Sequence, residues 1–268
     1  MSKSILITGA SGMVAKASAG KLKDHGFTVI GVSRSVENDA EEYTETERLD
    51  LLEKENLDRL KDLMNEVDAV FHLAWNKNVE NFDTGEKWPE NIEMFENVLD
   101  AAEKADVEIF VNGSSIHAGT GNISAYKVEA SLEDTPEPYR SSIDPESDFD
   151  LRKENPEKLL DPREDNPDSP YGESKIETEK KPRKDAENKD FRLGISIRIG
   201  GVNPEDKTEL EGEPYYGSLY WSHKDIGITL KNILESNLDE KNGYHQFYGV
   251  SDNKGRIFNI ENSFTTPK

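Results

Sequence analysis

The segment from Ser4 to Ala15, with the sequence SILITGASGMVA, constrains the fold more than any other part of the chain. Its apolar run, Ile5 to Ile7, is typical of a buried parallel strand. Gly9 and Gly12 then permit a tight turn and a close approach of the backbone to a ligand, and a following helix directs its free amide groups to the same place. The segment therefore predicts a strand, a turn and a helix that bind the pyrophosphate of a dinucleotide.

In the alternative interpretation, the same glycines only serve an ordinary connection between a strand and a helix. The surrounding pattern favours dinucleotide binding, because apolar residues at helical spacing follow the turn from Val14 to Leu22 and a second strand candidate, residues 28–32, comes next.

Short apolar segments alternate with segments of helical character along most of the chain. The strand candidates are residues 4–8, 28–32, 69–73, 108–112 and 194–199. Between the third and fourth candidates, Ile92, Phe95, Val98, Leu99 and Ala102 recur at helical spacing and predict one buried helix face. This alternation predicts an α/β fold of the Rossmann type, with a doubly wound parallel sheet.

The length of 268 residues fits one domain, and no internal repeat or polar linker divides it. We therefore expect a single domain over residues 1–268. The periodic pattern ends in residues 122–169, a stretch rich in Pro, Asp and Glu that we interpret as a long acidic insertion or lid. Residues 200–268 are expected to form mainly a small substrate-binding region.

The charge of the chain restricts its partners. There are 55 acidic against 33 basic residues, which gives a net charge of −22. Such a surface repels nucleic acid and anionic membranes, so we expect neither as a partner. No apolar run is long enough to cross a bilayer, and we expect a soluble, cytoplasmic protein. The absence of cysteine excludes disulfides and zinc–thiolate sites, and no metal is expected.

The sequence SPYGESK places Tyr171 and Lys175 four residues apart, on one face of a predicted helix. An ammonium group near a phenol favours the phenolate and lowers the tyrosine pKa from about 10. Tyr171 is therefore a candidate to take a proton from a substrate hydroxyl while hydride leaves the adjacent carbon. The same spacing also arises by chance on solvated helices, and the surrounding motifs decide between the two.

Three motifs together resemble the extended short-chain dehydrogenases/reductases of the NAD-dependent epimerase/dehydratase family. They are TGASGMV near the start, NGSSIH after the fourth strand candidate, and SPYGESK. The resemblance implies that Ser115 hydrogen-bonds the reacting oxygen, that Tyr171 is the acid/base, and that Lys175 tunes the tyrosine and holds the nicotinamide ribose.

The resemblance also implies a set of cofactor-binding residues in the glycine turn, after the second strand and around the third. Besides Tyr171 and Lys175 they are Gly9, Ser11, Gly12, Met13, Val14, Ser33, Arg34, Asp50, Leu51, Leu73, Ala74 and Asn91. The cofactor is NAD or NADP. An NAD-preferring relative would be expected to carry an acidic residue near Ser33, and Arg34 is instead a candidate for the 2′-phosphate of NADP.

Segments of the second half, SIRIGGVNP, YWSHKDI and FYGVSDN, are more narrowly similar to uronate dehydrogenases and to the NAD-dependent glucose-6-phosphate dehydrogenases of halophilic archaea. That resemblance implies oxidation of C1 of a sugar phosphate or uronic acid to the lactone. It makes His117, Arg140 and Arg198 substrate-binding candidates, because an arginine fork suits a carboxylate or phosphate. For Arg198 the alternative is a structural ion pair.

Two features depart from these relatives. Ile116 stands where the uronate group usually has an asparagine, which weakens that assignment. Pro182 follows the Tyr–Lys pair where relatives continue a helix, and proline is expected to end or kink it. Two other functions stay open, a nucleotide-sugar epimerase or dehydratase and a dinucleotide-binding regulator without catalysis. A homodimer is a further possibility.

The acidic composition predicts adaptation to high salt, because ions screen the repulsion between surface carboxylates. We expect the melting temperature to rise with KCl up to molar concentrations, as measured by circular dichroism. A melting temperature that stays flat over this range would contradict the prediction.

Overall fold

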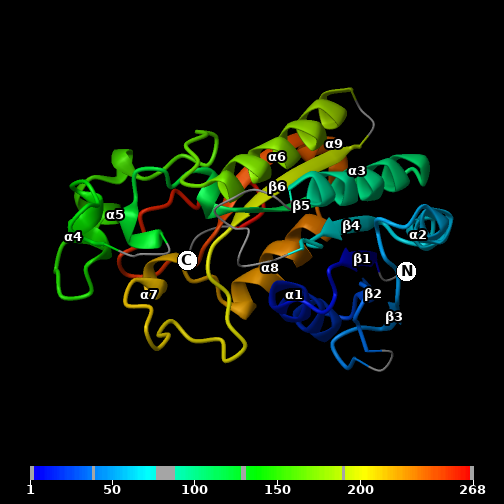
Figure 1. Cartoon of the computed structure of the whole chain (residues 1–268), viewed down its shortest axis with the longest axis horizontal. Coiled ribbons are helices and arrows are strands. Elements are labelled where there is room, and N and C mark those ends of the chain that lie inside the picture. Colours follow the sequence, from blue (N-terminus) through cyan, green and yellow to red (C-terminus); the bar gives the residue numbers. More distant parts are fainter. Residues whose placement is uncertain (1–2, 38–39, 77–87, 128–130, 189–190, 266–268) are drawn as a thin grey trace.

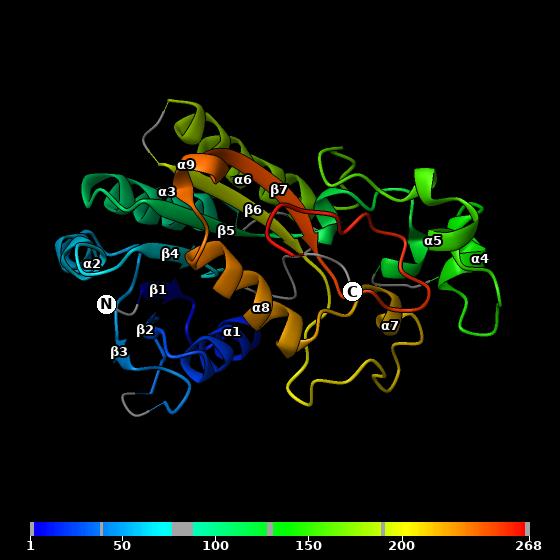
Figure 2. The same ribbon diagram turned by 180° about the vertical axis from the view of Figure 1, so that it is seen from behind.

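One parallel sheet organises the computed structural model, which describes residues 3–37, 40–76, 88–127, 131–188 and 191–265. The sheet has seven strands in the order β3-β2-β1-β4-β5-β6-β7, and every described pairing is parallel. The strands are β1 Ser4–Thr8, β2 Thr28–Val32, β3 Glu45–Glu47, β4 Ala69–His72, β5 Ile109–Ser115, β6 Leu193–Ile199 and β7 Gly243–Gly249. The predicted doubly wound α/β fold is confirmed (Figures 1 and 2).

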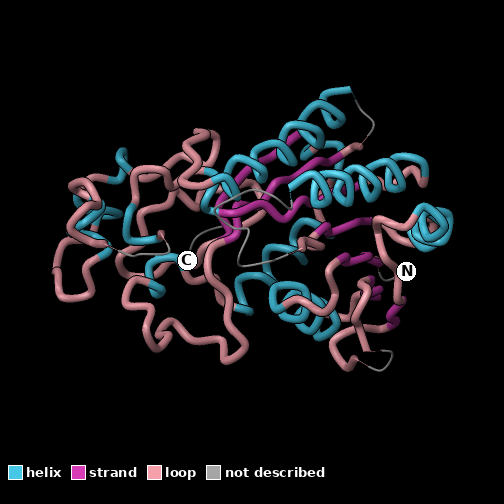
Figure 3. Tube along the Cα trace, viewed as in Figure 1, coloured by secondary structure: helices cyan, strands magenta, loops and turns pink. Residues whose placement is uncertain are grey.

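Helices cover both faces of the sheet, as the predicted alternation requires. Those packed on one face are α1 Met13–Asp24 and α8 His223–Leu234, and those on the other are α2 Leu57–Met64, α3 Trp88–Lys104 and α6 Pro170–Asn188 (Figures 1 and 3). Successive strand residues point to opposite faces. Accordingly Ile5 and Ile7 join the core under α1 and α8, and Leu6 joins the core under α2 and α3.

The five predicted strands are present, with ends that differ by up to three residues, and two further strands lie at the edges of the sheet. β3 has the sequence ETE, and β7 contains His245 and Gln246. An edge strand is buried on fewer sides than a central one, so its sequence carries little apolar signal. The predicted stripe of α3 is buried as expected, except that Ile92 is half-buried.

The described part of the predicted insertion, residues 122–127 and 131–169, contains short helices rather than an irregular loop. They are η4 Ser124–Tyr126, α4 Tyr139–Ile143, α5 Leu151–Glu154 and η5 Pro156–Lys158. A third apolar cluster, which includes Ile143 and Leu151, joins this segment to Phe258 and Ile260 near the C-terminus. Elements this short are below the length at which helical periodicity becomes visible in a sequence.

Pro182 lies inside α6 and does not end it, which corrects the expectation of a helix end there. A proline has no amide hydrogen to donate to the carbonyl four residues earlier, here that of Thr178. The buried side chain of Asn112, on β5, donates to this carbonyl at 3.2 Å instead. The hydrogen bond that the helix loses at Pro182 is therefore replaced from the sheet.

Within the described residues, no helix has the length and apolar character that crossing a membrane requires.

Replacing Asn112 by alanine should leave the Thr178 carbonyl buried without its donor and lower the free energy of unfolding by about 1–3 kcal/mol. In a Pro182→Ala background, the restored amide of residue 182 takes over that role, so the same Asn112→Ala change should cost less. Urea denaturation of the wild type, both single variants and the double variant measures the difference. An equal loss in both backgrounds would contradict this account.

Candidate active site

The glycine turn after β1 lies directly against the end of β4. Gly9 has a φ of +72°, and a Cβ atom there would lie 2.7 Å from the Ala74 amide nitrogen and 2.8 Å from the Leu73 carbonyl carbon. Only glycine fits this position without strain. α1 begins immediately after Gly12, and no side chain caps its first turn. The first amides of the helix are therefore available to an anion such as a pyrophosphate.

Thr8 and His72, neither of them predicted as site residues, fix the chain beside this turn. The Thr8 hydroxyl accepts hydrogen bonds from the amides of Leu73 and Ala74 at 3.1 and 3.2 Å, and its own hydrogen points to His72 Nδ1 at 2.9 Å. The proton of the imidazole must then be on Nε2, which has no partner among the described residues. Burial, assisted by the Lys175 charge, lowers the pKa of His72 to about 3, so the ring is neutral.

Several of the predicted cofactor-binding residues lie just beyond the ends of β1, β2 and β3. The Ser33 and Ser35 hydroxyls donate to the Ser11 hydroxyl at 3.3 and 3.1 Å. An Arg34 guanidinium nitrogen lies 3.7 Å from an Asp50 carboxylate oxygen, and both side chains are partly exposed. Such a pair contributes little to stability, which leaves both groups available to a ligand.

The remaining cofactor candidates lie around the same edge. Asn91 is buried at the start of α3. Its side-chain oxygen accepts from the Asn76 amide at 2.7 Å, and its side-chain nitrogen donates to the Asn76 carbonyl at 3.3 Å. It thereby fixes the chain that follows Leu73 and Ala74. Leu51 is buried, Val14 is half-buried, and Met13 is exposed at the first residue of α1.

The three predicted catalytic residues meet where β5 ends and α6 begins. Ser115 is the last residue of β5, and Tyr171 and Lys175 lie in the first turns of α6. The Ser115 hydroxyl is close enough to the Tyr171 phenol to lower the pKa of Tyr171. Gly172 makes this approach possible, because a Cβ atom there would lie 2.1 Å from the His117 carbonyl oxygen.

The electrostatics of Tyr171 differ from the expectation. Burial raises its pKa to about 12, although the Ser115 hydroxyl acts in the opposite direction. The pKa is therefore raised rather than lowered, because burial is the largest effect on Tyr171; the Lys175 ammonium nitrogen lies 5.7 Å from the tyrosine ring centroid. It donates to the Gly113 carbonyl at 2.9 Å and lies over the ring of Trp75.

His117 lies beside the tyrosine, with 5.7 Å between the ring centroids, and is oriented by Asp168. Its Nδ1 is 2.7 Å from an oxygen of this buried carboxylate, which also accepts from Thr120 and Ser169. Burial raises the Asp168 pKa, but the hydrogen bond from His117 and the two from the hydroxyls outweigh it and hold the pKa below its usual value. Because the carboxylate accepts at Nδ1, the imidazole carries a proton on this nitrogen.

Arg198 is not positioned to bind a substrate, which corrects its prediction. Its side chain is fully buried and donates to both carboxylate oxygens of Glu179, at 2.9 and 2.8 Å. It also donates to the Glu164 carbonyl at 2.6 Å and to Asp165. The alternative interpretation, a structural ion pair, describes this arginine.

Arg140 is likewise occupied locally. It belongs to α4, at the left end of the molecule in Figure 1, and its exposed guanidinium binds the Glu137 carboxylate at 2.8 and 2.9 Å. The structure gives no support for an anion-binding role next to Tyr171.

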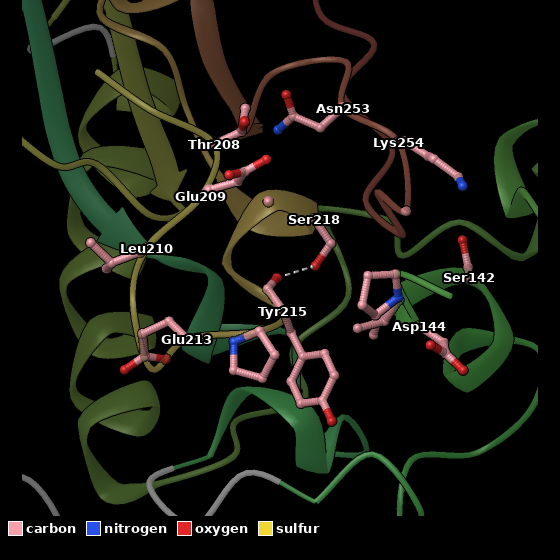
Figure 4. Close-up of a pocket in the computed structure, with 15 residues that line it drawn as sticks. Ser142, Asp144, Thr208, Glu209, Leu210, Glu213, Tyr215, Ser218, Asn253 and Lys254 are labelled. Atoms are coloured by element: carbon pink, nitrogen blue, oxygen red, sulfur yellow. Dashed lines mark hydrogen bonds between the residues drawn. The ribbon is translucent and has the colours of Figure 1, made fainter. Parts of the chain in front are cut away.

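A cavity of about 440 Å³ lies between the insertion and the C-terminal region (Figure 4). Its lining includes Ser142 and Asp144 from one side, residues 208–210 and 213–215 from another, and Lys254. None of Ser115, His117 and Tyr171 lines it, so it is separate from the reacting groups. Among the described residues, no cluster of His, Asp and Glu side chains has the arrangement of a metal site.

The chain is similar to a known protein family. A family model described as the NAD dependent epimerase/dehydratase family matches residues 5–195. No curated protein matches the chain in sequence.

Solved structures share the fold at low identity. A glucuronic acid dehydrogenase from Chromohalobacter salexigens is 21% identical, with a TM-score of 0.66 over 97% of this chain and 81% of its own. A mutant uronate dehydrogenase from Agrobacterium tumefaciens, complexed with NAD, is 18% identical, with a TM-score of 0.64 over 97% and 81%. A UDP-N-acetylglucosamine 4-epimerase from Bacillus cereus is 20% identical, with a TM-score of 0.59 over 94% and 80%.

The Asp168→Asn variant should lose the fixed orientation of His117, because an amide replaces one of two acceptor oxygens with a donor. We expect a loss of about 1–3 kcal/mol in the free energy of unfolding at neutral pH. The folded-state pKa of Asp168 is depressed, so its contribution is complete above the unfolded-state pKa of about 3.9 and disappears as the pH falls through the folded-state pKa.

Urea titrations of the variant and the wild type at several pH values measure this difference, and imidazole ¹⁵N shifts report the tautomer. Thr120→Val, which removes one donor to the same carboxylate, is the control. A deficit that does not shrink in acid, or an unchanged tautomer, would contradict the assigned role.

Proposed function

The chain belongs to the NAD-dependent epimerase/dehydratase family, and we propose that it is a dehydrogenase that oxidises C1 of a cyclic sugar acid or sugar phosphate to the lactone. The observation that carries the proposal is that Ser115, at the end of β5, meets Tyr171 at the start of α6, with Lys175 one helical turn further on, at the same sheet edge as the glycine turn. Proton transfer from a hydroxyl and hydride transfer from its carbon require that the dinucleotide-binding half of the site, around the glycine turn, lies beside the catalytic half, which contains Ser115, Tyr171 and Lys175.

The residues around the glycine turn form the half of the site that fits a dinucleotide. Gly9 provides a turn without a side chain, and the uncapped start of α1 offers its amides to the pyrophosphate. Ser33, Arg34 and Asp50 would hold the adenosine. When bound, NAD supplies the hydride acceptor. We propose NAD as the cofactor, because the matching family model is that of NAD-dependent enzymes and a structure with the same fold was solved with NAD.

In the second half, Tyr171 takes the proton of the C1 hydroxyl and Ser115 hydrogen-bonds the same oxygen. Lys175 balances the negative charge of the phenolate and holds the nicotinamide ribose. Since burial raises the pKa of Tyr171 to about 12, the reactive phenolate is a small fraction at neutral pH and increases as the pH rises. Oxidation should therefore become faster with increasing pH.

The substrate class rests on the narrower resemblance and on His117. The Nε2 side of the imidazole can contact a sugar hydroxyl beside Tyr171, because Asp168 holds the opposite ring nitrogen. Solved structures with the same fold include a uronate dehydrogenase and a glucuronic acid dehydrogenase. Both arginines expected to bind the substrate's anion are engaged by carboxylates, so the test compares charged sugars with an uncharged one.

The test is absorbance of the reduced nicotinamide in molar KCl, with NAD and NADP each supplied with glucuronate, galacturonate, glucose 6-phosphate or uncharged glucose. We expect a signal with NAD and one of the charged sugars. Turnover of glucose alone would contradict the acidic or phosphorylated substrate. Purified protein that retains NAD and converts a nucleotide sugar without net reduction would instead be an epimerase.

Tyr171→Phe should lower turnover by at least about two orders of magnitude, because it removes the proton acceptor and keeps the ring. Its affinity for NAD, measured by calorimetry, should be nearly unchanged. Ser174→Ala is a matched control, since the Ser174 hydroxyl binds the Tyr171 carbonyl within the helix. Near-normal turnover of the phenylalanine variant would exclude Tyr171 as the acid/base.

A further inference from the structure

Trp75 joins the two halves of the proposed site. The centroid of its ring lies 3.5 Å from the ammonium nitrogen of Lys175 and 5.9 Å from the ring centroid of Tyr171. It directly follows Leu73 and Ala74, the residues whose backbone packs against Gly9. One side chain thus contacts the lysine of the catalytic set, and its chain neighbours support the glycine turn.

The contact matters because Lys175 is only 5% exposed. A buried ammonium must replace its lost hydration with other partners. The Gly113 carbonyl accepts one of its hydrogen bonds at 2.9 Å. The face of an indole carries negative electrostatic potential and is the most favourable aromatic surface for a cation. The indole thus stabilises the ammonium on a side that the carbonyl does not cover.

The place of Trp75 in the fold adds a second argument. In an open parallel sheet, ligands bind outside the carboxyl ends of the strands. Trp75 lies three residues beyond the end of β4, between the glycine turn that follows β1 and the serine that ends β5. Asn76, the next residue, is held by the buried Asn91, so the backbone that carries the indole is fixed.

We propose that Trp75 is a positioning residue, which holds the Lys175 ammonium through its ring face and forms a wall of the nicotinamide end of the cofactor crevice. This inference rests on the proposed function, in that the crevice is taken to bind NAD. It differs from a space-filling role in one respect. A flat aromatic face is then essential at position 75, and apolar volume alone is insufficient.

Two variants separate these roles. Trp75→Phe keeps a ring face over the ammonium, and Trp75→Leu keeps apolar volume without one. We expect the dissociation constant for NAD, measured by calorimetry, to rise about tenfold in Trp75→Leu and less than about threefold in Trp75→Phe. Circular dichroism spectra and melting curves verify that both variants fold. Equal affinities in the two folded variants would overturn the positioning role.

Fluorescence tests the position of Trp75 at the crevice without any turnover. The chain has three tryptophans, of which Trp221 is buried in the core under α8 and Trp88 begins α3. NAD should quench the emission of the wild type and of the matched control Trp88→Phe. In Trp75→Phe most of the quenching should disappear although calorimetry still detects binding. Undiminished quenching in that variant would overturn the assignment.

The outcomes for Trp75 can be distinguished from a failure of the proposed function. A protein that binds NAD and quenches through Trp75 but oxidises no sugar would refute the dehydrogenase and support the role of Trp75. A wild type for which calorimetry detects no NAD binding would refute both.

Discussion

The buried ion pair between Arg198 and Glu179 is the interaction on which the site geometry depends. It joins β6 to α6, and Glu179 lies one helical turn beyond Lys175. Ser114, Gln246 and Asp165 add hydrogen bonds from β5, β7 and the insertion. Removing one member would leave a buried charge without its partner, which is far more costly than losing an exposed pair. The helix that carries the Tyr–Lys pair is thus fixed by electrostatics behind the site.

The N-terminal end of the same helix is fixed by close packing. Gly172 allows α6 to begin against the carbonyl of His117, and Asp168 binds the imidazole of that residue. Further along, Asn112 satisfies the carbonyl that Pro182 cannot. Because these contacts hold both the strand end and the helix start, they reinforce the ion pair in fixing Ser115 relative to Tyr171. Such preorganisation is what proton transfer requires.

The sequence predicted the parts of the fold that depend on local pattern. Central strands such as β1 are continuous apolar runs, and the glycine turn has a conformational requirement that few residues meet. Arg198 shows the limit of prediction from the sequence. Its motif is equally compatible with a bound ligand and with a buried carboxylate, and only the fold brings Glu179 next to it. Asp168 and Trp75 were missed because their partners are remote in the chain, 51 and 100 residues away for His117 and Lys175.

The third apolar cluster affects how the protein unfolds and which of its segments tolerate sequence change. It joins the insertion to the C-terminal segment, and most of its residues lie outside the two cores that flank the sheet. Regions with separate cores can open as separate cooperative units. The part of the fold built on the sheet can therefore stay folded while the insertion and the C-terminal segment loosen. The same separation allows sequence changes in the insertion and the C-terminal segment to leave the glycine turn and the sheet that carries it undisturbed.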